Sequence, residues 1–153
     1  MNDSIKIKGW IEYKIYGVDG KVRDEGTVYN TITNAGLAQL ALLAGDASAT
    51  PFTYLALGSG TTAPAASQTA LVTESTTNGF ARVAATVSRV TTTQTNDTLQ
   101  LTTTFTASGS ATIEEIGIFN ASSSGTMLSR ALTGSKSFVS GETYTTTYKV
   151  KFS

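Results

Sequence analysis

Hydrophobic and polar residues alternate along most of the chain, as they do in β-strands that turn one face to a core and the other to solvent. Ile11, Tyr13 and Ile15 share one phase of this alternation, and the even-numbered positions of 144–152 share another. Turn-forming Gly, Ser and Asn residues separate such segments about every 10–15 residues. The pattern predicts a mainly β fold, either an antiparallel β-sandwich or a barrel.

The first two segments predict an N-terminal β-hairpin, with strands in residues 5–16 and 21–32 around a Gly-rich turn. The first thirty residues hold ten of the chain's 22 charges (11 basic and 11 acidic). One interpretation is a solvated hairpin face, and the other is an arm whose edge strand pairs with a neighbouring subunit. Trp10 is out of phase with Ile11 and Tyr13, which suggests an interface contact or a sugar-stacking platform, and we favour the interface. The candidate interface residues are Trp10, Glu12, Lys14, Arg23 and Tyr29.

A short helix is predicted at about residues 34–44. Thr33 or Asn34 can cap its start, and Gly45 suits a left-handed position just past its end. The segment is hydrophobic almost all round, so we expect it to be well buried. We predict a single β-rich domain over residues 1–153, with a hairpin or arm in 1–31 and a sandwich core in 32–153.

Composition narrows the possible functions. The 153 residues carry no net charge, which argues against a nucleic-acid binder. There is no His and no Cys, so the chain has no imidazole to act as a general base near neutral pH or as a metal ligand, and no thiolate nucleophile, zinc knuckle or disulfide framework. Only 14% of the residues are charged, whereas 28 are threonine and 16 are serine. Such a composition is typical of proteins that are rich in strands or buried in an assembly. Because residues 1–4 lack the features of a signal peptide and no apolar run is long enough to cross a bilayer, we expect no membrane association.

Candidate catalytic groups are scarce. Glu114 and Glu115 are adjacent, but neighbours on a strand face opposite sides and cannot easily share one reaction centre. Gly58-Ser59-Gly60 lacks the spacing of a phosphate-binding or dinucleotide-binding loop. The sequence therefore predicts a protein that is not an enzyme, with no catalytic residue, cofactor or metal site.

Several short motifs follow one another in an order that resembles bacteriophage virion proteins, notably head-proximal domains of tail fibres and small accessory virion proteins. The motifs are Ile32-Thr33-Asn34-Ala35-Gly36, residues 57–64 (LGSGTTAP), Thr69-Ala70-Leu71 with Glu74, residues 113–120 (IEEIGIFN) and residues 125–130 (GTMLSR). The resemblance spans about residues 30–132 and brings no catalytic residues with it.

The motif residues have structural interpretations. Gly58, Gly60 and Gly117 permit tight turns or close backbone approach. We expect Glu74 and Glu115 either to satisfy buried loop amides or to meet two arginines, Arg82 and Arg130.

The resemblance implies a virion protein that is assembled in the cytoplasm of the host bacterium. Since a tail fibre would continue into a long shaft, we expect a capsid decoration protein, most simply a homotrimer that binds between capsomers. Its expected partners are copies of itself and the major capsid protein or other virion proteins, held by strand addition and apolar contact. A tail or tail-fibre attachment component is the first alternative, and a carbohydrate-binding adhesive β-sandwich is the second.

Overall fold

The computed structural model describes residues 4–153 and confirms a mainly β fold built from two antiparallel sheets of five strands each. Residues 1–3, on which the expected lack of a signal peptide partly rests, lie outside the described residues. The elements are β1 (Ile7–Tyr16), β2 (Val22–Tyr29), β3 (Thr31–Ile32), α1 (Asn34–Gly45), β4 (Tyr54–Gly58), β5 (Val83–Ala84), β6 (Thr86–Val90), β7 (Thr98–Thr106), β8 (Ala111–Phe119), β9 (Met127–Phe138) and β10 (Thr143–Phe152).

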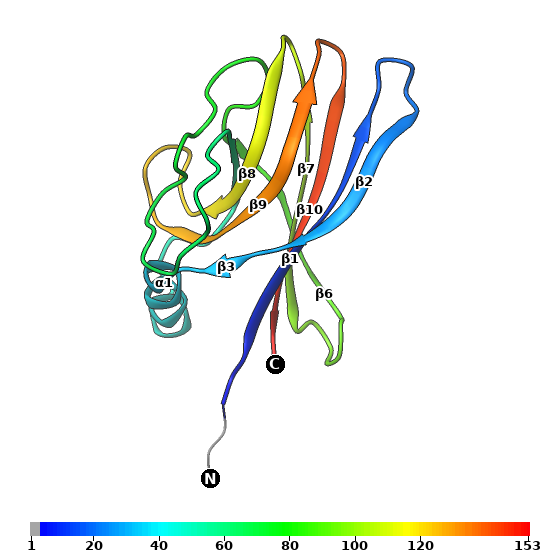
Figure 1. Ribbon diagram of the computed structural model, residues 1–153. Helices are drawn as coiled ribbons and strands as arrows, with labels where there is room; N and C mark the ends of the chain where they lie inside the picture. The colour runs from blue at the N-terminus through cyan, green and yellow to red at the C-terminus, as the bar shows by residue number, and fades with distance from the viewer. Residues whose placement is uncertain (1–3) are drawn as a thin grey trace.

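The strand order is β2-β1-β10-β7-β6 in the first sheet and β3-β9-β8-β4-β5 in the second (Figure 1). The N-terminal hairpin, β1 and β2, is built into the first sheet, because β1 pairs with β10 along its whole length, from Ile7 opposite Phe152 to Tyr16 opposite Thr143. The first and last strands of the chain are therefore neighbours, and residues 7–16 form an inner strand of the first sheet next to its central strand, β10.

Both long edges of the sandwich are closed by chain segments that pass from one sheet to the other. The predicted strand over residues 21–32 divides at Asn30 into β2 of the first sheet and β3 of the second. On the other side, Ala85 separates β5 of the second sheet from β6 of the first. Such crossings join the corners of a sandwich without a loop, and they give this one a partly barrel-like cross-section.

The core lies between the two sheets. Ile11 and Ile15 of β1 and Tyr144 and Tyr148 of β10 are fully buried there, as the period-two pattern predicts. From the second sheet and the loops come Phe80 and other fully buried side chains, among them Leu55, Leu57, Ile113, Ile116 and Ile118.

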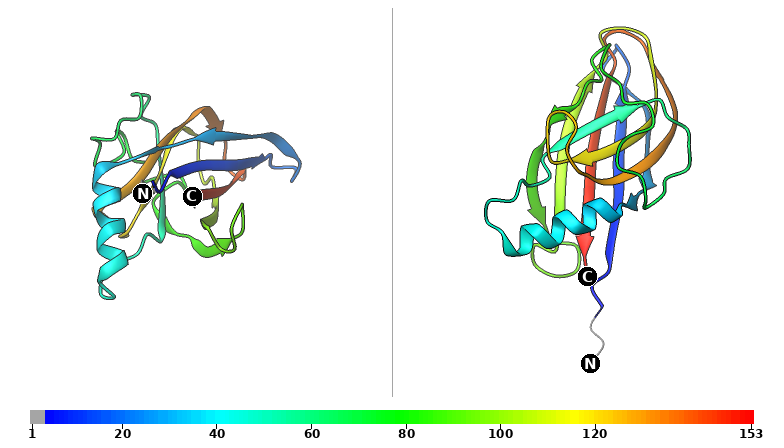
Figure 2. Two further views of the ribbon diagram at one scale, coloured as in Figure 1. Left: turned by 90° about the horizontal axis from the view of Figure 1, so that it is seen from below. Right: turned by 90° about the vertical axis from the view of Figure 1, so that its left-hand side faces the viewer.

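Helix α1 occupies the predicted residues but is much less buried than expected. Thr33 caps its first turn by accepting a 2.9 Å hydrogen bond from the Gly36 amide. Among the residues of α1 only Gly36 is fully buried, and Leu37 and Leu42 are 44% and 48% exposed. The helix lies across one end of the sandwich, and the left-hand face that carries it is turned to the viewer in the right-hand panel of Figure 2. It contributes only one side to the core, which is why its other side stays in solvent.

The end of the helix also differs from the prediction. Gly45 is the last helical residue and does not have a left-handed conformation, and Asp46 follows in an extended conformation as the C-cap. The backbone amide of Asp46 donates to the Leu42 carbonyl, so the last turn closes without a left-handed residue.

Candidate functional site

The outer face of β2, β1 and β10 brings together four of the five predicted interface residues. Trp10, Glu12 and Lys14 point away from the core on β1. Tyr29 of β2 lies directly opposite Trp10 in the pairing register and is 78% exposed. Directly opposed residues of antiparallel strands have neighbouring side chains on the same face. The two aromatic residues therefore form one patch, which the sequence alone did not show.

Glu12 holds the Trp10 side chain in place. Its Oε1 atom accepts hydrogen bonds from the Trp10 indole Nε1 at 2.9 Å and from the Lys149 ammonium at 2.8 Å. These two hydrogen bonds lower the pKa of the Glu12 carboxyl below its ordinary value, against the opposing effect of partial burial. The Lys149 Nζ atom also lies 5.9 Å from the centre of the Trp10 ring. The ion pair between Glu12 and Lys149 thus holds the indole ring on the outer face of the sheet.

Two adjoining hollows follow this patch across the sheet. The first has a volume of about 530 Å³, and its lining includes Trp10, Tyr29, Asn30, Lys8 and Lys151. The second, of about 560 Å³, continues along Lys14, Glu25 and the β10 threonines. Both include Glu12 and Thr27, so they form one shallow groove.

The groove carries an excess of positive charge at one end. Lys8 lies directly opposite Lys151 in the pairing of β1 with β10. Neither ammonium forms an ion pair with a described acidic side chain, although Lys151 donates to the Thr93 hydroxyl. Like charges placed directly opposite each other destabilise a sheet. Lys8, Lys149, Lys151 and Asn30 were not singled out from the sequence, because their positions depend on strand pairings between distant segments.

Arg23, the fifth predicted interface residue, lies apart from the other four. Its side chain turns from β2 toward β9 and the β9–β10 turn. It forms an ion pair with Glu142 at 2.8 Å and donates to the Ser137 carbonyl at 2.6 Å. Arg23 thus joins the edge of the first sheet to the second sheet, a role within the fold.

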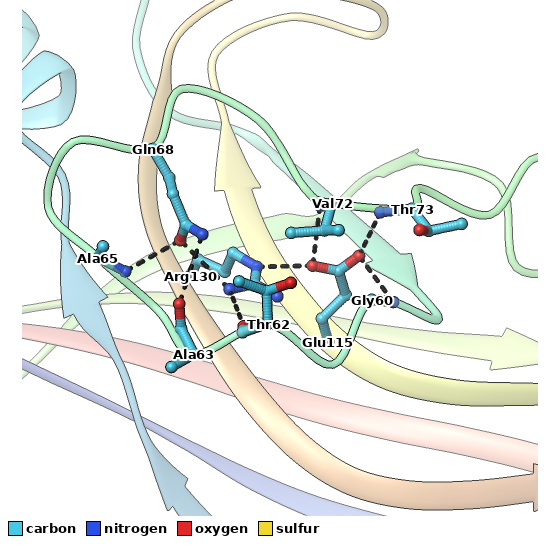
Figure 3. Close-up of polar contacts among 9 residues, drawn as sticks. All are labelled: Gly60, Thr62, Ala63, Ala65, Gln68, Val72, Thr73, Glu115 and Arg130. Carbon is cyan, nitrogen blue, oxygen red and sulfur yellow. Dashed lines mark hydrogen bonds and ion pairs between the residues drawn. The ribbon is translucent and has the colours of Figure 1, made fainter.

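A second polar cluster lies buried beneath the loop that follows β4 (Figure 3). Its centre is an ion pair between Glu115 of β8 and Arg130 of β9, with 2.6 Å between Oε2 and Nε and both side chains at most 1% exposed. The Glu115 carboxylate also accepts hydrogen bonds from the amides of Gly60, Val72 and Thr73. It therefore meets both kinds of partner that the sequence left open, an arginine and the loop amides.

Arg130 reaches the same loop from the other side of the ion pair. Its Nη1 atom donates to the Thr62 carbonyl at 2.7 Å and to Gln68 Oε1 at 3.2 Å. The Gln68 side chain in turn accepts from the Ala65 amide. The pair thus holds both ends of the segment 60–73 against the second sheet, and the part played by Gln68 had no signal in the sequence.

The predicted turn glycines lie around this cluster. A Cβ atom on Gly58 would be 2.4 Å from the Thr73 carbonyl oxygen, and one on Gly60 would be 2.5 Å from Glu115 Oε1. Gly117 lies under Leu71, with 3.0 Å from an added Cβ to the Leu71 side chain. All three positions therefore serve close approach of the loop to the sheet.

Glu74 forms a second ion pair with Arg82, through two hydrogen bonds of 2.8 and 2.7 Å. The Arg82 guanidinium lies 3.7 Å from the centre of the Phe119 ring and also donates to the carbonyls of Ala121 and Ser124. This pair attaches the β8–β9 turn to the loop that precedes β5. Like the Glu115–Arg130 pair, it fixes a loop on the sandwich.

Residues 4–153 contain no group of three or more acidic side chains placed to hold a metal ion. No helix of this described part is long and apolar enough to span a membrane. The features that remain as a candidate site are thus the groove and the aromatic patch on the outer face of the first sheet.

Comparison with known proteins identifies a protein family. A family model described as podophage GP4 fiber I protein gp80 matches residues 29–149, about four fifths of the chain. The match includes the whole Glu115–Arg130 cluster, whereas β1 with Trp10, Glu12 and Lys14 precedes it. No curated protein and no solved structure matches the chain.

Proposed function

Since the chain belongs to the family of podophage GP4 fiber I protein gp80, a family of phage virion structural proteins, we propose that it is a subunit of the fibre apparatus of a bacteriophage tail. In this role it binds other virion proteins and copies of itself and catalyses no reaction. The observation that carries the proposal is the family match over residues 29–149.

The same match favours the tail-fibre alternative over the capsid decoration protein that we first expected from the sequence. The length of the chain was the reason for preferring decoration, and length does not distinguish a short fibre component from a decoration protein. The buried motifs are equally uninformative on this point, because they hold loops on the sandwich wherever the protein is placed in the particle.

Copy number in purified particles tests the proposal. We expect quantitative mass spectrometry of particles to find this chain in tens of copies or fewer, and immunogold labelling to place it at the tail. The major capsid protein in the same sample provides the internal standard. Hundreds of copies spread over the shell would instead support decoration, and absence of the chain from particles would refute a virion role.

A second candidate function, contact with a surface polysaccharide, is favoured by the groove. We infer it from the pairing of Trp10 with Tyr29, since neighbouring aromatic rings beside hydrogen-bonding groups are what sugar rings stack on. Lys8 and Lys151 at the end of the groove favour an acidic polysaccharide. Binding would relieve the repulsion between the two ammonium groups.

We expect Trp10→Ala to weaken binding of an acidic polysaccharide from the host surface at least about tenfold, or 1.4 kcal/mol, in isothermal titration calorimetry. Val87→Ala is the matched control, since Val87 is 42% exposed on the same sheet in β6 and lines neither hollow of the groove. If wild-type protein shows no saturable binding, or if both variants bind alike, the polysaccharide function is excluded. Deleting residues 1–30 would not test the groove, because the deletion removes β1 and with it part of the core.

A further inference from the structure

Helix α1 has an apolar side that no part of residues 4–153 covers. Its sequence, residues 34–45 (NAGLAQLALLAG), contains no charged residue. Leu40 and Leu43 pack on the core, whereas Leu37 and Leu42 are 44% and 48% exposed on the opposite side, with Ala38 and Ala41 exposed between them. A helix that is apolar all round is normally buried on all sides. Here only one side of the helix is buried within the molecule.

The uncharged surface extends beyond the helix. The loop after β4 meets the helix start, where the Asn34 amide donates to the Ala66 carbonyl at 2.8 Å. Residues 61–67 (TTAPAAS) of this loop are exposed except for Pro64. The right-hand panel of Figure 2 shows α1 and this side of the molecule facing the viewer together. Between residues 31 and 73 the sequence has a single charged residue, Asp46 at the far end of the helix.

We propose that α1 and residues 61–67 form a contact between copies of this chain, in which the α1 faces pack against one another. The proposal rests on the proposed function, because a fibre subunit is present in several copies in one particle. Partners of a different kind are commonly selected by opposite charges, and this surface offers none. Two identical uncharged faces, by contrast, meet without like-charge repulsion and without burying an unpaired charge.

The size of the surface indicates that the contact needs both segments. A 12-residue helix is only about 18 Å long, which is short for a stable interface of roughly 20–30 residues a side. The helix together with the adjoining loop comes closer to this range. The contact therefore uses both segments, and Leu37 and Leu42 are the large apolar side chains that α1 exposes to it.

The test is self-association of the full chain, measured by sedimentation velocity at micromolar concentrations. We expect wild-type protein to form an oligomer, and Leu42→Glu to raise the dissociation constant at least about a hundredfold, because the carboxylate would be buried without a partner. Since Leu42 is half exposed, the variant keeps its fold, which circular dichroism and thermal unfolding verify. Val139→Glu is the matched control: Val139 is 54% exposed in the β9–β10 turn, away from α1.

A charge-complementation experiment shows whether the helices meet directly. We expect Leu42→Glu and Leu42→Lys to be monomeric separately and to associate when mixed. A monomeric wild-type protein, a Leu42→Glu variant that remains oligomeric, or two variants that stay monomeric in the mixture would each overturn the proposal. A Leu42→Glu variant that remains oligomeric but is lost from particles would assign the face to another virion protein. These outcomes leave the fibre assignment intact, since that assignment depends on copy number and position in the particle.

Discussion

Replacement of Arg130 by alanine is expected to lower the free energy of unfolding by about 3–5 kcal/mol. The reason is that the fully buried Glu115 carboxylate loses the guanidinium with which it is paired. The same change removes the hydrogen bonds to Thr62 and Gln68 that hold the middle of the loop (Figure 3). Urea denaturation followed by circular dichroism measures the loss. Limited proteolysis should also show faster cleavage within residues 60–73.

Lys14→Ala is the control for this change. Lys14 also pairs with a glutamate, Glu25, but at 3.7 Å and with both side chains more than half exposed. Exposed pairs of this kind contribute at most about 1 kcal/mol, so the control should unfold almost as the wild type does. If Arg130→Ala and Lys14→Ala have similar small effects, the buried pair is not what holds the loop.

The buried cluster explains what the motif series encodes. Gly60, Thr62 and Thr73 belong to or adjoin the motifs after β4, and all three meet Glu115 or Arg130 from the two later motifs. The first motif meets the last in the same way, because the Thr33 hydroxyl donates to the Met127 carbonyl. The series therefore records how segments distant in sequence pack together. It identifies the family without indicating which surface contacts a partner.

Strand positions could be predicted from the sequence because each strand has one buried face, and burial produces the alternation. The crossing from one sheet to the other could not be predicted. At Asn30 and Ala85 the chain stays extended, and the change of partner is visible only in the long-range hydrogen bonds of these residues to the backbones of Gly9 and Thr53. The aromatic patch was hidden for a similar reason. The phase of Trp10 indicates the outer face, but its position opposite Tyr29 and near Lys149 depends on strand register.

The helix shows a different limit of the sequence. Its location follows from local signals, the Thr33 cap and the apolar run, which act within a few residues. The degree of burial of the helix does not follow from local signals. An apolar side of a helix can be covered either by the chain's own core or by a neighbouring molecule. The prediction of a well-buried helix assumed the first source of burial, and the exposure of Leu37 and Leu42 shows that the fold itself does not supply it.

Replacing Gly36 by alanine is expected to destabilise the protein by about 1–3 kcal/mol, although alanine is the better helix former. A Cβ atom at this position would lie 2.6 Å from the Leu128 carbonyl oxygen and 2.7 Å from the Leu128 Cα. Both are backbone atoms of β9, so the helix has to move away from the strand. The change should appear as a lower midpoint in urea denaturation.

Gly45→Ala in the same helix provides a control of opposite sign. An added Cβ atom there meets nothing within 4 Å, and the residue has an ordinary helical position at the end of α1. The gain in helix propensity then acts alone, so stability should rise, by at most about 1 kcal/mol. If Gly36→Ala is stabilising as well, the helix does not need its close contact with β9. If it is destabilising and also weakens self-association while Gly45→Ala leaves association unchanged, the docking of α1 on β9 positions the surface through which copies meet.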